Sequence, residues 1–164
     1  MASDSLVAID CMTLVWGVRK EGPKESLERA KILFQNFERD KSQIIVPSIV
    51  VAEYLTAVDV NKRFDVAAAI GARFLVMPFD IKCTALAANL FSDGKSGRPM
   101  SQPNARVCLR ADSMIVATAK IHGAKVFYSH DKNCRSMAKN AGMDPWDLPT
   151  HVENLFPSPD PSEE

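Results

Sequence analysis

The sequence predicts an α/β fold, a three-layer α/β/α sandwich around a central, mostly parallel sheet of four to five strands. Three observations support this prediction. Short apolar runs alternate with longer amphipathic stretches, the runs are closed by Asp or Pro, and Gly residues end several of the stretches. Strands that alternate with helices in this way form parallel βαβ units with right-handed crossovers.

Short apolar runs mark the expected strands. The first run ends at Asp10, and the second and third are closed by Pro47 and Pro78. A fourth run lies between Gly123 and Asp131. Each run is apolar throughout, which is typical of a parallel strand that is buried on both faces. The expected strands are residues 5–9, 44–46, 73–77 and 125–128, with a short fifth strand at 146–148.

Helical periodicity fills the stretches between these runs. Apolar residues recur there every three or four positions, with charged residues between them. The expected helices are residues 24–37, 49–58, 64–70, 81–91, 113–121 (opened by Asp112) and 131–138. Residues 11–18 are consistent with a loop or one helical turn, and residues 92–109, with two Gly and two Pro, are expected to form a loop.

Length and composition indicate one domain, residues 1–150, followed at 151–164 by an acidic, Pro-rich tail that we expect to be disordered. A hydrophobic content of 46% and a charged content of 24% are those of a soluble globular protein. Lys plus Arg and Asp plus Glu both number 20, so the chain has no overall basic field. Any nucleic-acid binding must therefore depend on a local patch.

The cysteines are widely separated and form no CxxC pair of the kind that binds zinc. The start of the sequence has no signal-peptide pattern, and no apolar run is long enough to cross a bilayer. We therefore expect a cytoplasmic protein with reduced thiols and no contact with a membrane.

Four acidic residues stand where an open α/β sheet builds its ligand site. Asp10 and Asp131 follow the first and fourth expected strands. Asp112 opens a helix, and Glu53 lies early in the helix after the second strand. Carboxylates gathered at one edge repel each other unless protons or a cation intervene, and oxygen ligands favour Mg²⁺ or Mn²⁺ over zinc. We therefore predict that all four acids bind metal and are catalytic in a displacement at a phosphate.

A locally basic segment adjoins Asp112. Through Arg110 it carries four basic residues against only Asp93, and we predict that it contacts phosphates of a nucleic acid. Ser129, a hydroxyl next to the proposed site, is a further candidate. The predicted substrate-binding residues are Lys95, Arg98, Arg106, Arg110 and Ser129.

Each of these residues also has a simpler interpretation. Asp10 could end a strand in a turn, Asp112 and Asp131 could be helix caps, and Glu53 could face solvent. The basic segment could be ordinary solvated surface. The joint placement of the four acids is what favours a site.

Three segments resemble the PIN domain family. They are VAIDCMTL, VPSIVVAEYL and ADSMIVATAKIHGAKVFYSHDKNC, and the similarity extends from about Leu6 to about Leu148. The third segment is the most specific, with an Asp opening an Ala-containing helix, then Gly, a strand and Ser-x-Asp. The resemblance implies a PIN-type three-layer fold and a Mg²⁺- or Mn²⁺-dependent ribonuclease.

The resemblance also assigns roles to residues. Asp10, Glu53, Asp112 and Asp131 match the acidic positions of the family, Ser129 matches its small hydroxyl residue, and Asn133 falls where some members have a further ligand. Many compact bacterial PIN proteins are toxins of toxin–antitoxin pairs, which implies an antitoxin or regulator as a protein partner and a homodimer.

The chain departs from the family in two places. Cys11 and Met12 stand where small polar residues usually follow the first Asp, and Thr13 comes one step later. Cys134 replaces the aromatic residue that is common after the last acid. These changes concern the surroundings of the acids and leave the acids in place.

Three alternatives to a nuclease follow from the sequence. A degenerate PIN domain could act as a scaffold or binding module. A haloacid-dehalogenase-like phosphatase needs a second acid where Met12 stands. A receiver-type signalling module needs paired acids after the first strand and a phosphoacceptor after the third, whereas Asp10 has no acidic neighbour and Pro78-Phe79-Asp80 suits that role poorly. The sequence has no GxSxG, HExxH or P-loop motif.

Overall fold

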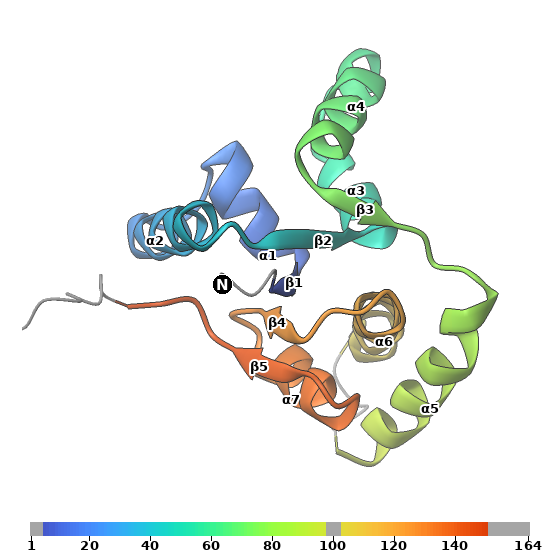
Figure 1. Cartoon of the computed structure of the whole chain (residues 1–164). Helices are drawn as coiled ribbons and strands as arrows, with labels where there is room; N and C mark the ends of the chain where they lie inside the picture. Colours follow the sequence, from blue (N-terminus) through green and yellow to red (C-terminus); the bar gives the residue numbers. More distant parts are fainter. Residues whose placement is uncertain (1–4, 98–102, 151–164) are drawn as a thin grey trace, which may run out of the picture.

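Five parallel strands form the centre of the molecule, in the spatial order β3-β2-β1-β4-β5 (Figure 1). The computed structural model describes residues 5–97 and 103–150. The strands are β1 (Leu6–Ile9), β2 (Gln43–Pro47), β3 (Leu75–Met77), β4 (Val126–Tyr128) and β5 (Asp144–Trp146). Helices flank this sheet, and the predicted three-layer α/β/α fold class is confirmed.

The central strand β1 is the most enclosed part of the sheet. It pairs with β2 and β4, so that Ala8 lies between Ile45 and Phe127, and all three of these residues are fully buried. Burial on both faces explains why the strands are continuous apolar runs without alternation. The carboxyl end of β1 therefore projects Asp10 from the middle of the sheet edge.

The helices between the strands supply the two outer layers and carry most of the polar side chains. They are α1 (Cys11–Leu14), the π-helix η1 (Val15–Arg19), α2 (Lys24–Asp40), α3 (Ser48–Leu55), the 3₁₀ helix η2 (Val60–Lys62), α4 (Arg63–Arg73), α5 (Ile81–Gly97), α6 (Ala105–Ile121) and α7 (Lys132–Asn140). In Figure 1, α4 projects away from the sheet, whereas α5 lies alongside α6. No helix in the described part of the chain combines the length and the apolar character that a bilayer span needs.

The expected loop at residues 92–109 is wrong over most of its length. Helix α5 continues to Gly97, and α6 already begins at Ala105. Gly94 belongs to the contact between these helices, because a Cβ atom at position 94 would lie 2.5 Å from Leu109 Cδ1. The glycine that favoured a loop in the sequence is thus needed for close helix packing.

The early start of α6 also corrects the interpretation of Asp112. This residue is the eighth of the helix and does not open it, so a cap role for Asp112 is excluded. Residues 11–19 form α1 followed by the π-helix, which ends at Lys20 with a φ of 60°. The last strand is Asp144–Trp146, two residues earlier than expected.

Candidate active site

Asp10 lies at the carboxyl end of β1 and is the most buried of the four predicted acids, with 8% of its surface exposed. One carboxylate oxygen, Oδ1, accepts a hydrogen bond of 2.9 Å from the backbone N–H of Thr13 and so caps α1. The other oxygen, Oδ2, accepts a hydrogen bond from the Ser129 hydroxyl. Both oxygens of Asp10 are therefore held in fixed positions.

Ser129 connects Asp10 to the end of the neighbouring strand. Its Oγ accepts a hydrogen bond of 3.0 Å from the backbone N–H of Asp131 while donating to Asp10. The Asp131 carboxylate in turn accepts from the N–H groups of Asn133 and Cys134, at 2.7 and 3.2 Å. Asp131 is thus the N-cap of α7 and has an exposed side chain at the same sheet edge as Asp10.

Glu53 reaches this edge from α3. Its half-buried carboxylate is hydrogen-bonded to the thiol of Cys11, the residue after Asp10. Burial raises the pKa of Glu53, and the nearby charge of Asp10 raises it further. The same surroundings raise the pKa of the Cys11 thiol to about 12, first by burial and then by the charges of Glu53 and Asp10.

Asp112 approaches the site from α6 and is half-buried. It lies near the buried thiol of Cys134. The pKa of this thiol is raised first by burial and then by the charges of Asp112, Asp10 and Asp131. All three carboxylates therefore lie close enough to Cys134 for their charges to act on its sulfur atom. With Glu53 beside Asp10, all four predicted acids border one region.

The four acids make this region strongly negative. Burial raises the pKa of Asp10, hydrogen bonds from Ser129 and Thr13 oppose that rise, and the charge of Asp131 adds to it. Within the described residues, no salt bridge joins Asp10, Glu53 or Asp131 to a basic side chain. A buried carboxylate without a cationic partner and an all-oxygen donor set fit a hard divalent cation.

The carboxylates are nevertheless spaced more widely than the ligands of one ion. In the described part of the chain, one group of three His, Cys, Asp or Glu side chains has its ligand atoms within 4.8 Å of each other, and it consists of Asp80, Cys83 and His122. No three of the four acids meet that spacing. The structure thus brings the acids to one region without closing them into a single coordination shell.

Two further residues at this site were not assigned a role from the sequence. The Thr13 hydroxyl is buried beside Asp10, and together with the Thr13 backbone N–H it lowers the pKa of Asp10 against the effect of burial. Arg19 donates a 2.6 Å hydrogen bond to the carbonyl oxygen of Tyr54 and stacks 4.2 Å from its ring centre, and its charge acts on Cys11. The sequence did not predict this position of the Arg19 side chain. Arg19 lies in the π-helix, whose residue spacing differs from the α-helical spacing used to predict helix faces.

The predicted basic segment is only partly described. Arg98 and the side chain of Lys95 lie outside the described residues. Arg106 is exposed in the first turn of α6. The guanidinium of Arg110 lies 5.3 Å from the ring centre of Phe91, so this cation also holds α5 and α6 together.

Comparisons with known proteins agree with this architecture. The model of the PIN domain family matches residues 13–140, and no curated protein matches the chain. FitAB bound to an IR36 DNA fragment is similar with a TM-score of 0.60 and 19% identity over 92% of this chain and 99% of that chain. VapBC2 from Rickettsia felis bound to a DNA fragment from their promoter has a TM-score of 0.56 and 16% identity over 87% and 98%. DNA-bound VapBC from Salmonella typhimurium has a TM-score of 0.57 and 16% identity over 88% and 98%.

Proposed function

Because this chain belongs to the PIN domain family, whose members are generally nucleases, we propose that it is a divalent-metal-dependent endoribonuclease that hydrolyses RNA phosphodiester bonds. The observation that carries the proposal is the hydrogen-bonded link from buried Asp10 through Ser129 to Asp131 at one sheet edge, with Glu53 hydrogen-bonded to the neighbouring Cys11. A region of this charge attracts a hard cation, and hard cations held by carboxylates are suited to chemistry at phosphate.

Asp10, Glu53, Asp112 and Asp131 are the proposed ligands of Mg²⁺ or Mn²⁺. When bound, such an ion supplies Lewis acidity, which acidifies water and neutralises phosphate charge. The chain itself supplies orientation, because Thr13 and Ser129 fix both oxygens of Asp10 and the first amides of α7 fix Asp131. Glu53 is the proposed proton acceptor for the attacking water, since burial moves its pKa towards neutrality.

The substrate would enter from the side of α5 and α6. We propose that Lys95, Arg98, Arg106 and Arg110 bind RNA phosphates, and that Ser129 acts beside the reacting phosphate by holding Asp10. Arg106 is exposed six residues before Asp112 on the same helix, roughly 9 Å along its axis, which supports an approach from this end of α6.

The neighbouring structures support the proposal of a protein partner. FitAB and VapBC are toxin–antitoxin assemblies, and their structures contain DNA. By extension we propose that this chain is the toxin of such a pair, bound by a protein antitoxin or regulator, with a homodimer as its own assembly. An RNA substrate is in keeping with a cytoplasmic location.

One observation favours a second candidate, a catalytically degenerate PIN scaffold. No three of the four acids, all of them described residues, have ligand atoms within 4.8 Å of each other. In addition, the Cys11 thiol is hydrogen-bonded to the Glu53 carboxylate. A scaffold of this kind would keep the fold and the partner surface while hydrolysing nothing.

Cleavage of a pool of structured and unstructured RNAs would separate the two candidates. The nuclease should cleave with Mg²⁺ or Mn²⁺ and stop when chelator is added, and Asp112→Asn should abolish cleavage. Asp65→Asn, on the exposed first turn of α4, is the matched control and should cleave like the wild type. Failure of the wild type to cleave any RNA with either ion would favour the scaffold.

A further inference from the structure

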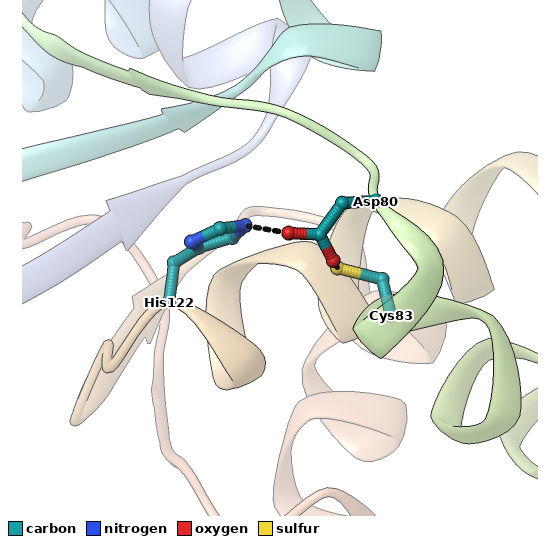
Figure 2. Close-up of side chains that lie close together, drawn as sticks. All are labelled: Asp80, Cys83 and His122. Atoms are coloured by element: carbon teal, nitrogen blue, oxygen red, sulfur yellow. Dashed lines mark hydrogen bonds and ion pairs between the residues drawn. The ribbon is translucent and has the colours of Figure 1, made fainter.

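A second group of potential metal ligands lies at the start of α5 and the end of α6, the helix ends opposite to those that carry the basic segment. Asp80 precedes α5, Cys83 lies in the first turn of α5, and His122 caps the end of α6. Figure 2 shows the three side chains pointing towards one another from these two helix ends. Cys83 is fully buried, whereas the side chains of Asp80 and His122 are 36% and 19% exposed.

The distances within this group are close to those around one tetrahedral ion. Bond lengths of about 2.0–2.3 Å place two ligands of a tetrahedral zinc ion about 3.3–3.8 Å apart. His122 Nε2 lies 3.8 Å from Asp80 Oδ2, which is too long for a hydrogen bond. Cys83 Sγ lies 3.4 Å from the other carboxylate oxygen, Asp80 Oδ1. One ligand atom from each residue falls within 4.8 Å of the others, so shifts of about 1 Å in these side chains would bring three ligand atoms to one ion.

The surrounding contacts hold Asp80 and Cys83 in place before any ion binds, whereas the His122 imidazole contacts a carbonyl oxygen. Asp80 Oδ1 accepts a 2.9 Å hydrogen bond from the backbone N–H of Lys82 and so caps α5. His122 Nε2 lies 2.9 Å from the carbonyl oxygen of Pro78, which is also 3.9 Å from Cys83 Sγ. An ion would replace the contact between the imidazole and this carbonyl, and the fourth position would be open to water.

This group is distinct from the acidic site. Asp112 and His122 are ten residues apart on α6, which corresponds to roughly 15 Å along the helix axis. The donor atoms also differ, because a thiolate and an imidazole select a softer ion than four carboxylates do.

We propose that Asp80, Cys83 and His122 form a zinc site that fastens the start of α5 to the end of α6. Its ligand is a borderline-soft divalent ion such as Zn²⁺, and Mg²⁺ is excluded by the sulfur and nitrogen donors. Binding releases the thiol proton of Cys83 to solvent as the sulfur becomes a thiolate ligand. The site braces α6, the helix that carries Asp112, against the loop that follows β3.

Cobalt(II) is the probe for the test, because a thiolate ligand gives Co²⁺ an intense near-ultraviolet charge-transfer band. The full chain, freed of metal with chelator, should show this band on titration with Co²⁺, and Zn²⁺ should displace it. Cys83→Ser should remove the band. Cys108→Ser is the control for an exposed thiol, and Cys11→Ser is the control for a thiol beside the acidic site; both should keep it.

Two further variants test the nitrogen and oxygen ligands. Asp80→Asn can still cap α5 and should fold, and His122→Asn removes the imidazole. Each should weaken Zn²⁺ binding by more than about tenfold and lower the rise in melting temperature that Zn²⁺ causes. His130→Asn, at an exposed imidazole that contacts Asp147, is the matched control and should bind like the wild type.

The outcomes distinguish this site from the acidic site. A wild-type chain without the cobalt band, or a band that persists in Cys83→Ser, would overturn the proposal. Equal Zn²⁺ affinity in His122→Asn and the wild type would do the same. Asp112→Asn should retain the band, so loss of RNA cleavage in that variant carries no information about the zinc site.

Discussion

The two groups of potential metal ligands differ in donor atoms and in the elements that supply them. The acidic site combines carboxylates from the ends of β1 and β4 with one from α3 and one from α6. The second group combines a carboxylate, a thiol and an imidazole that meet where α5 packs against α6. The four acids from the strand ends and helices are spaced too widely for three of them to hold one ion as they stand, whereas helix packing brings the three ligands of the second group within 4.8 Å of each other.

Catalysis is where the two groups should differ most. Asp112→Asn should reduce RNA cleavage in Mg²⁺ by roughly 100-fold or more, because a direct ligand is lost. Cys83→Ser should leave cleavage in Mg²⁺ within about twofold of the wild type, since sulfur takes no part in Mg²⁺ binding. Gel assays of a fixed RNA measure both rates. Comparable losses in the two variants would mean that the groups act as one site.

Thermal unfolding in two buffers should give the next largest difference. In chelator, Asp112→Asn should melt at or above the wild-type temperature, because one of several repelling charges is gone. In Mg²⁺ or Mn²⁺ it should lose most of the metal-induced gain, which is about 2.7 kcal/mol at 100 times the dissociation constant. Asp10→Asn should behave similarly, and Asp65→Asn should show neither effect. Equal destabilisation of Asp112→Asn in both buffers would point to a structural role.

RNA affinity tests the basic segment beside the acidic site. Replacing Arg98 and Arg106 by Ala should weaken binding of all RNA sequences, and each lost phosphate contact should lower the salt slope by about 0.7. Filter binding over a range of salt concentrations measures both quantities. Lys62→Ala, at an exposed position in η2, serves as the control. An unchanged affinity and slope in the double variant would make the segment ordinary surface.

The pH dependence of stability should show the smallest difference. The pKa of Asp10 is raised in the folded chain, so its favourable contribution is complete below the unfolded pKa near 3.8 and is lost as the pH rises through the folded pKa. In chelator, the wild type should therefore lose stability relative to Asp10→Asn as the pH rises from about 4 towards neutrality. Urea titrations at several pH values give this difference. A difference that stays flat over this range would mean that Asp10 keeps its ordinary pKa.

Sequence reasoning succeeded where the topology decides the outcome. Apolar runs closed by Asp or Pro identified the strands, and parallel pairing then required Asp10 and Asp131 to share an edge. The fold class predicted on this basis is confirmed, as is the family predicted from the resemblance of three sequence segments. The metal-binding and catalytic roles of the acids remain predictions.

Sequence reasoning failed where side-chain packing decides the outcome. Gly94 signals a loop in the sequence, yet its missing Cβ admits Leu109 and lets α5 continue. Consequently the sequence predicts a start of α6 near Asp112, seven residues later than the observed start at Ala105, and with it a possible cap role for Asp112. Cys83 and His122 are 39 positions apart in a pattern with no metal-binding motif, so only the packing of two helices reveals their proximity.

The Ser129 hydroxyl favours the ionised form of Asp10 against the effect of burial. Its single proton is directed to Asp10 Oδ2, while its lone pair receives the N–H of Asp131. A proton on Oδ2 would face the Ser129 proton, so one of these two protons would have to turn away and lose its acceptor. The hydrogen bonds therefore run in one direction, from the Asp131 N–H to the Ser129 oxygen and from the Ser129 hydroxyl to Asp10. An ionised Asp10 carboxylate is the acceptor that this arrangement needs. Burial favours the neutral acid at Asp10, and this one hydroxyl opposes that tendency from the neighbouring strand.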